Sequence, residues 1–221
     1  MIKKAIMTFA MATLVAGGAS AAGDKTYTLS KDKTVTSVTQ GSVHYSPPSI
    51  LGGGHVLFSN FGKKYPKGLY FCCYGDTISG PNSAVGTPFA VALQFTPASD
   101  GDVKEIDAGV AWAAGTNSVT IGLYDDNSGV PGNVIASGVA TGLGMFGDCC
   151  TIAAAKLKEA PVAGGTPYWV VVSATGTTWA SWAANSTDQI DGLTIAYSAD
   201  GGSTWSPDGE LPAASFQVLG R

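Results

Sequence analysis

Short apolar runs recur along the chain, and glycine, proline, asparagine or aspartate separates each run from the next. In residues 119–124, Val119, Ile121 and Leu123 fall on one face, which is the two-residue period of a half-buried strand. Residues 169–172 are apolar on both faces and indicate a strand that is covered on both sides. The same signals predict further strands over residues 55–58, 69–74, 89–96, 103–112, 134–136, 151–156, 178–184, 193–197 and 215–219.

The spacing of these strands predicts the fold class. Turn signals follow about every ten residues, which is typical of sandwiches and barrels. Residues 153–159 give the best helical pattern, and that segment is short. We therefore expect an all-β chain over residues 55–221, folded as a two-sheet antiparallel β-sandwich with jelly-roll-like connections.

The N-terminus has the layout of a secretory signal. Lys3 and Lys4 precede an uncharged, mostly apolar stretch over residues 5–19, and Ala19-Ser20-Ala21 is the small-x-small pattern that signal peptidase cleaves. A bilayer span needs about 20 apolar residues, and this stretch is shorter. We expect a signal peptide over residues 1–22, a secreted or periplasmic mature protein, and no membrane span after cleavage.

A polar segment follows over residues 23–54. Thr, Lys and Ser alternate with apolar residues over 24–40, which leaves two alternatives, an edge strand or a flexible lead-in. Residues 41–54 contain Pro47-Pro48 and three consecutive glycines, and they predict a loop.

The charge of the chain excludes several partners. Without Lys3 and Lys4 it has 10 basic and 16 acidic residues, a formal charge of −6, and Arg221 is its only arginine. Nucleic-acid binding depends on patches of Lys and Arg that neutralise phosphates, so we expect no nucleic-acid partner. Only 13% of the residues are charged and 45% are hydrophobic, which indicates an ordered, packed domain.

The four cysteines form two adjacent pairs, Cys72-Cys73 and Cys149-Cys150. An even number of cysteines in an exported chain predicts disulfides, and four cysteines allow three connectivities. Of these we favour cross-links between the two segments, because a bridge that closes a loop of about 77 residues contributes about 4 kcal/mol in the chain-entropy model. The Cys-x-x-Cys spacing of redox and zinc sites is absent.

A catalytic set is not evident in the sequence. The histidines are His44 and His55, and no Gly-x-Ser-x-Gly elbow accompanies them, so a Ser-His-Asp hydrolase is not indicated. A glycosidase needs two carboxyl groups that face each other across a cleft. Aspartates are plentiful, but most occur in turn sequences such as Asp191-Gly192, where local backbone bonding explains them.

All five tryptophans of the chain could stack on sugar rings, Trp169 and Trp205 included, and the candidates we select are Trp112, Trp179 and Trp182. The last two are three residues apart, so in a strand they point to opposite faces. At least one of them therefore belongs to the core, which is the usual place for tryptophan in a sandwich.

Calcium is the one metal for which the chain offers a candidate site. Asp125, Asp126 and Asn127 cluster side-chain oxygens, the ligands that calcium prefers. The cluster does not fit an EF-hand loop, and a solvated turn is the alternative interpretation.

Two turns have specific sequence signals. Val130–Asn133 predicts a type II turn, in which Pro131 presets the first central residue and Gly132 supplies a positive φ at the second. Residues 198–205 resemble the Asp box of sialidases and other β-propeller proteins. The matching positions are Ser198, Asp200, Gly202, Thr204 and Trp205.

The resemblance to the Asp box implies a hairpin turn in which the aspartate bonds the backbone and the tryptophan packs beneath. In those families the box lies away from the active site. Sialidases repeat the box and bind the substrate carboxylate with several arginines. This chain has one box and one arginine, so sialidase activity is not expected.

About three quarters of the chain resembles the choice-of-anchor R domain of exported bacterial proteins. The matching blocks are residues 57–62, 78–83, 117–124, 126–132, 168–172 with Trp179 and Trp182, and 216–220. The resemblance implies an extracytoplasmic β-sandwich without an assigned activity. The family is named for its varied C-terminal sorting tails, whereas this sequence stops at Gly220-Arg221, so we expect a released or periplasmic protein.

These patterns favour an exported, non-catalytic β-sandwich with a binding or surface-structural role toward extracellular glycan or matrix. Two alternatives stay open. One is a secreted hydrolase that acts on glycans through an Asp/Glu pair. The other is a structural component that associates with itself.

Overall fold

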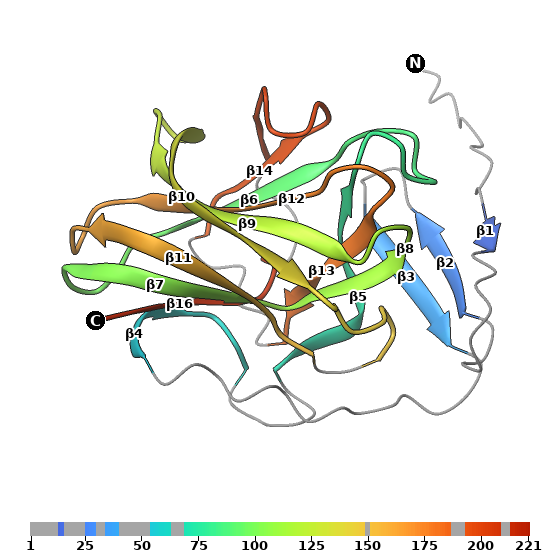
Figure 1. The fold of residues 1–221 in the computed structure, drawn as a ribbon, viewed down its shortest axis with the longest axis horizontal. Coiled ribbons are helices and arrows are strands. Elements are labelled where there is room, and N and C mark those ends of the chain that lie inside the picture. The colour runs from blue at the N-terminus through green and yellow to red at the C-terminus, as the bar shows by residue number, and fades with distance from the viewer. Residues whose placement is uncertain are drawn as a thin grey trace, which may run out of the picture.

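A computed structural model describes residues 13–15, 25–29, 34–39, 54–62, 69–148, 151–186, 193–208 and 213–221. The described residues form antiparallel sheets without a helix, so the prediction of an all-β sandwich is confirmed (Figure 1). In this part of the chain, no helix is long and apolar enough to cross a membrane.

One layer of the sandwich is a six-stranded sheet, which we name the first sheet. Its strands, in spatial order, are β10 (Pro131–Thr141), β9 (Ser118–Asp126), β12 (Tyr168–Ser173), β6 (Ala90–Phe95), β14 (Ile195–Ser198) and β15 (Ser206–Asp208). Val119, Ile121 and Leu123 point into the core from β9, as their period predicted. On the central strand β12, Trp169–Val172 are buried on both faces, because the outer face of this sheet is covered as well.

The opposite layer consists of two sheets. The second sheet contains β11 (Ala153–Val162), β7 (Gly101–Ala108), β16 (Phe216–Gly220) and β4 (His55–Ser59). The third sheet contains β1 (Thr13–Val15), β2 (Lys25–Leu29), β3 (Thr34–Thr39), β5 (Tyr70–Ser79), β13 (Trp179–Asn185) and β8 (Val110–Ala114).

The second and third sheets meet at Gly109, where the predicted single strand 103–112 divides into β7 and β8. The Gly109 N–H donates to the Ser215 carbonyl at 2.9 Å, and its own carbonyl accepts from Ala183 N at 2.8 Å. A Cβ at this position would collide with Ser215 Oγ. The chain therefore changes sheets at a glycine, and the expected two-sheet sandwich has three sheets.

The segment 153–159, which was the best candidate for a helix, lies in β11. Ala155 and Leu157 are buried, whereas Lys156 and Lys158 between and after them are exposed. This is the two-residue period of a strand with one face on the core. Pairing with β7 therefore overrides the helix propensity of alanine, lysine and glutamate.

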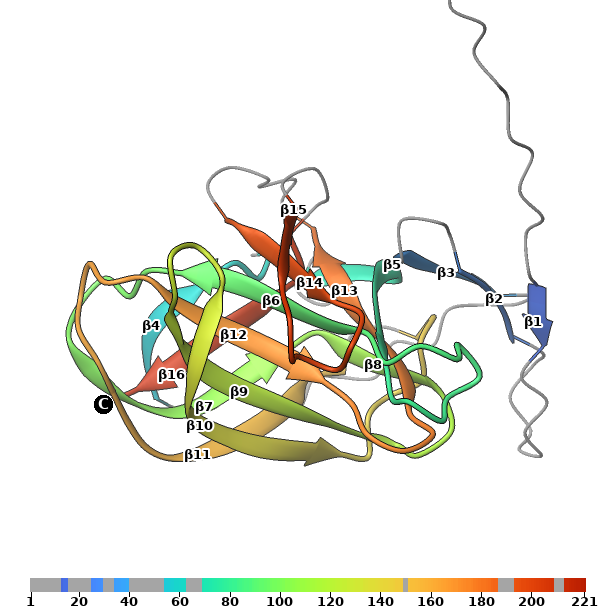
Figure 2. The ribbon, with the colours of Figure 1, turned by 90° about the horizontal axis from the view of Figure 1, so that it is seen from above.

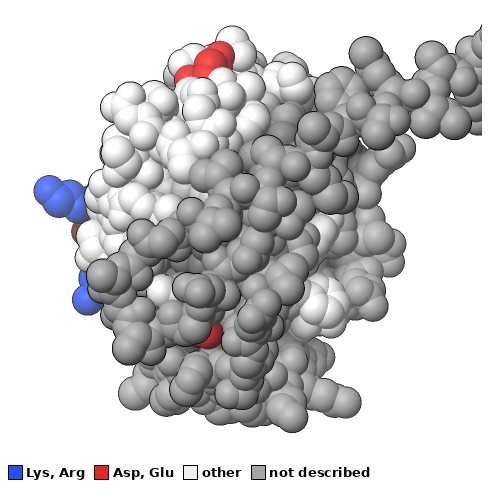
Figure 3. Space-filling model, turned by 90° about the vertical axis from the view of Figure 1, so that its right-hand side faces the viewer, with Lys and Arg blue, Asp and Glu red and all other residues white. Residues whose placement is uncertain are grey.

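Between the two alternatives for residues 24–40, the structure favours strands, because β2 and β3 form a hairpin and β3 pairs with β5. With β1, this hairpin stands to one side of the sandwich (Figures 1 and 2). Figure 3 views this end of the molecule, where the described surface has few charged residues. β1 lies within the predicted signal peptide, and cleavage of that peptide stays a prediction.

Aromatic rings fill the core between the layers. Phe216 packs against Phe58 with ring centroids 5.0 Å apart, and against Phe95 and Trp182 at 6.0 Å each. These four residues come from three sheets, so the cluster joins both layers.

A buried polar pair also joins the layers. The hydroxyl of Tyr197 on β14 donates to Asp76 Oδ1 on β5 at 2.6 Å, and both residues are 3% exposed. A hydrogen bond to a charged group contributes more than one between neutral groups. The pair therefore fixes the third sheet against the first across the core.

We expect Tyr197→Phe to lower the free energy of unfolding by about 2 kcal/mol, because it removes a hydrogen bond to a buried carboxylate. Urea denaturation followed by circular dichroism measures the loss. The matched control is Tyr168→Phe, whose hydroxyl only accepts a bond from Ala163 N at 3.0 Å in an exposed position. Equal losses in the two variants would show that the Asp76 bond has no special weight.

Candidate functional site

The structure places two of the three predicted sugar-stacking tryptophans in the core. Trp179 and Trp182 are 1% and 0% exposed. They point to opposite faces of β13, as predicted: Trp182 joins the main core, and Trp179 packs on Ala111, Ala113 and Phe146. Because β13 lies between β5 and β8 and is covered on both faces, neither ring can stack on a ligand, and that prediction is wrong for both.

Trp112 is half-buried on β8. Its indole N–H donates to the Gly115 carbonyl at 3.1 Å, and its backbone bonds Gly144 and Phe146 at 2.7 Å each. The residue thus closes the turn after β8 and holds the loop that contains residues 142–148. Its role in the described structure is to order these loops.

The predicted calcium ligands are not gathered into one site. Asp125 and Asp126 follow each other in a strand, so their carboxylates point to opposite faces. Asp125 accepts from the backbone N–H of Asn133 and from its Nδ2 at 3.2 Å. The Asn127 N–H donates to Val130 O at 2.8 Å. Within the described ranges, no three His, Cys, Asp or Glu side chains lie close enough to hold a metal ion.

The turn predicted at Pro131 and Gly132 lies three residues earlier. Ser128 and Gly129 have φ values of 56° and 87°, the two positive values of a type I′ hairpin turn. Pro131 already pairs with Asp126 as the first residue of β10. Gly132 serves another purpose, since a Cβ there would collide with Asp125 Oδ1. The prediction of a type II turn is therefore wrong.

The Asp-box segment forms the expected hairpin between β14 and β15. Asp200 Oδ1 accepts from the backbone N–H groups of Ser203 and Thr204, both at 2.9 Å, and Oδ2 accepts from Thr204 Oγ1 at 2.6 Å. Ser198 Oγ donates to Asp200 Oδ1 at 2.6 Å and accepts from Gly202 N at 2.7 Å. The hydrogen bond from Ser198, followed by those from Thr204, holds the pKa of Asp200 well below its usual range, so the carboxylate stays ionised.

The outer face of the first sheet has a row of large side chains. Tyr124, Trp169 and Gln94 are direct cross-strand neighbours on β9, β12 and β6. Asp126 Oδ1 accepts from both Trp169 Nε1 and Gln94 Nε2, at 2.8 Å each, and its Oδ2 accepts from Gly129 N at 3.2 Å. One carboxylate thereby fixes the orientation of an indole and an amide on two other strands.

Two aromatic rings lie over small residues on this face. Ala92, Val171 and Ala196 form a buried cluster with Trp169, and the partly exposed rings of Tyr124 and Trp205 pack against it. A Cβ at Gly122 would approach Tyr124 Cε2 to 2.7 Å, so the tyrosine ring leans along its own strand over that glycine. Burial raises the pKa of the Tyr124 hydroxyl, which stays a neutral donor at physiological pH.

We name this surface the aromatic face and define it by Tyr124, Trp205, Trp169, Gln94 and Asp126. The β9–β10 and β14–β15 hairpins stand on the same side of the first sheet (Figure 1), and seen from above β6 and β12 pass between them (Figure 2). From the sequence, Trp205 was assigned to a turn, Asp126 to the candidate calcium site and Trp169 to a strand covered on both faces, whereas Tyr124 and Gln94 were not candidate site residues. The sequence signal that could have found them is the alternation of side chains along a strand, which places Tyr124 and Trp169 on the face opposite to the core.

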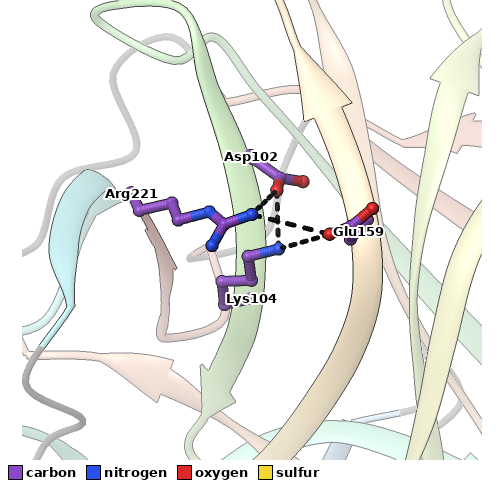
Figure 4. A network of polar contacts seen from close by, with 4 residues as sticks. All are labelled: Asp102, Lys104, Glu159 and Arg221. Atoms are coloured by element: carbon purple, nitrogen blue, oxygen red, sulfur yellow. Dashed lines mark hydrogen bonds and ion pairs between the residues drawn. The ribbon is translucent and has the colours of Figure 1, made fainter.

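A second cluster of polar side chains lies on the second sheet (Figure 4). Lys104 Nζ contacts Asp102 Oδ2 at 2.6 Å and Glu159 Oε1 at 3.9 Å, and Arg221 Nη2 contacts both carboxylates at 3.5 Å. The side chains of Glu159 and Arg221 are 79% and 70% exposed. Exposed ion pairs of this kind contribute little to stability.

This network does not have the chemistry of a glycosidase pair. Such a pair keeps one carboxyl group protonated by raising its pKa, so that it can act as the general acid. Here the hydrogen bond from Lys104, together with the charges of Lys104 and Arg221, lowers the pKa of Asp102.

Comparison of the chain with family models, with curated proteins and with solved structures finds no match. The resemblance to the choice-of-anchor R domain therefore stays a prediction. The site must be interpreted from its own geometry.

Proposed function

We propose that this protein is an exported, non-catalytic binding module whose aromatic face holds an extracellular glycan. The observation that supports it is the pair of partly exposed rings, Tyr124 and Trp205, on an apolar floor beside the Gln94 amide. A sugar presents apolar C–H faces and polar hydroxyl edges, and a site with flat rings next to a few fixed polar groups matches both.

The orientation of the polar groups supports binding by a preformed surface. Asp126 holds Gln94 and Trp169 in place without a ligand, and the Asp-box bonds hold the hairpin that contains Trp205. Little side-chain entropy is then lost when a ligand binds, which favours affinity. Export is supported by the sequence of residues 1–22 and by the cysteine pairs.

The two alternatives from the sequence have weaker support. In the ion network, Lys104 lowers the pKa of Asp102, whereas a general acid needs a raised pKa. Self-association has only the exposed valines of the edge strand β10 in its favour, Val134 at 55% and Val139 at 64% exposure. Scattered exposed apolar side chains are common on monomeric proteins.

Tyr124→Ala is the variant that tests the proposal. We expect the protein that starts at residue 23 to bind glycans on an array, and the variant to bind the same glycans at least tenfold more weakly. A ring that stacks on a ligand contributes on the order of 1.5 kcal/mol, and 1.4 kcal/mol corresponds to tenfold in affinity. Isothermal titration measures the change.

The matched control is Phe71→Ala, because Phe71 is an aromatic residue that is 46% exposed on β5 of the third sheet. It should leave affinity unchanged. Thermal melts of both variants check that the sandwich stays folded. Equal losses in the two variants, or no binding of any glycan by the unsubstituted protein, would contradict the proposal.

A further inference from the structure

The charges of the described side chains are divided between the layers. Every described Lys or Arg side chain lies on the second sheet or directly after it: Lys104, Lys156, Lys158 and Arg221. The first sheet and its two hairpins, residues 127–130 and 199–205, contain no Lys or Arg in their sequence. Around the aromatic face the charged groups are Asp126 and Asp200, since Asp125 points to the opposite face of β9.

We propose that the aromatic face selects uncharged glycans and rejects anionic polysaccharides. This inference rests on the proposed function, and it names the class of glycan for that site. Carboxylate and sulfate groups of a ligand are usually bound by Arg or Lys through charge-assisted hydrogen bonds. The aromatic face offers no such donor among the residues of its sheet and hairpins.

Asp126 and Asp200 act on a ligand mainly through their electrostatic field and less through direct contact. Asp126 already accepts from Gln94, Trp169 and Gly129. The Asp200 oxygens are likewise bonded to the backbone and hydroxyls of its own hairpin. Their negative field extends about 8 Å at physiological ionic strength, which is enough to oppose an anionic sugar unit.

Val139 gives a way to weaken this negative field without altering the residues that define the aromatic face. It is 64% exposed on the edge strand β10 and pairs with Thr120, which precedes the core residue Ile121 and therefore points outward. A lysine is well tolerated on an exposed edge strand. Val139→Lys adds a cation to the outer face, and Val139→Thr is the matched uncharged control.

The experiment compares glycans that differ only in charge, such as methyl-esterified oligogalacturonides and the same chains after de-esterification, within an array of neutral, acidic and cationic glycans. We expect binding to neutral glycans and at least tenfold weaker binding to acidic counterparts at low salt. The difference in affinity between neutral and acidic glycans should become smaller as the salt concentration is raised. The Val139→Lys substitution should also reduce this difference in affinity, whereas Val139→Thr should leave it unchanged.

The outcomes separate the inference from the proposed function. Acidic glycans bound at least as tightly as neutral ones would overturn the inference and leave the proposed function standing. If no glycan binds, the proposed function fails, and the inference fails with it. A charge preference that Val139→Lys does not change would also overturn the inference, because the field of this face would not be its cause.

Discussion

Replacing Trp182 with alanine is expected to lower the free energy of unfolding by about 4 kcal/mol, within the range of 3–5 kcal/mol that is typical for deleting a buried tryptophan side chain. Trp182 is 0% exposed. Its ring packs edge to face on Phe216 at 6.0 Å, and its Nε1 donates to the Ser215 carbonyl at 2.9 Å. The substitution leaves a cavity between the layers and removes one of the two hydrogen bonds that the Ser215 carbonyl accepts, while the bond from Gly109 N remains. Urea denaturation followed by circular dichroism measures the loss.

Trp112→Ala is the control for this result, because Trp112 is also a tryptophan but is half-buried at the rim of the core. It should cost clearly less. If Trp182→Ala lost less than about 1 kcal/mol, the ring would not be part of a packed core, and the earlier interpretation of Trp182 as a binding residue would have to be reopened.

Reduction of the cysteines is expected to have an effect of similar size, about 4 kcal/mol, if the two pairs are cross-linked. The side chains of Cys72 and Cys73, and residues 149–150 as a whole, lie outside the described part of the structure, so the pairing stays a prediction. Its support is the hydrogen bond from the Tyr70 hydroxyl to the Thr151 carbonyl at 2.7 Å. This contact brings together the segments that flank the two pairs.

Mass spectrometry of peptides from the unreduced protein, cut between the two segments, identifies the linkage. Unfolding with and without reductant then gives its contribution to stability. Free thiols, or bridges within each adjacent pair, would contradict the prediction. A cross-link that forms but leaves stability unchanged would show that the chain-entropy estimate does not apply here.

Much of the fold follows from local pattern, because a strand with one face on the core repeats every two residues. Residues 119–124 are an example, and β9 contains all of them. Pairing between distant segments determines the turns and strand ends that the local two-residue pattern does not specify. Pro131 is a central residue of the turn that the sequence predicts, but its pairing with Asp126 makes it the start of β10. At Gly109, contacts with Ser215 and Ala183 divide a strand that appears continuous in the sequence.

Some hydrogen bonds that stabilise the fold join residues that are far apart in the sequence. The Asn60 side chain donates to Ala214 O at 2.8 Å and accepts from Phe216 N at 2.7 Å, in addition to the backbone bond from Asn60 N to Phe216 O at 3.1 Å. Asn117 bonds both the N–H and the carbonyl of Leu143. A lone asparagine in the sequence gives no indication of such a partner.

The only part of the candidate site that the sequence predicted is the hairpin around Asp200, whose hydrogen bonds join near neighbours in the chain. The hairpin at the Asp-box segment was predicted because the Asp200 side chain bonds Ser203 and Thr204, three and four residues further along the chain. The tryptophans were ranked wrongly, because the sequence shows that Trp179 and Trp182 point to opposite faces but not that both faces of β13 are covered. Tyr124 and Trp205 meet on one buried cluster only after four strands have paired.

The most direct test of the account is to map a bound glycan on the protein. A glycan selected on the array is titrated into the isotope-labelled protein while amide and indole N–H signals are followed by NMR. We predict that the largest shifts occur at the indole of Trp205, at the side-chain amide of Gln94 and at Gly122. Shifts confined to the second sheet, around Lys156 and Lys158, would contradict the assignment of the aromatic face as the binding site.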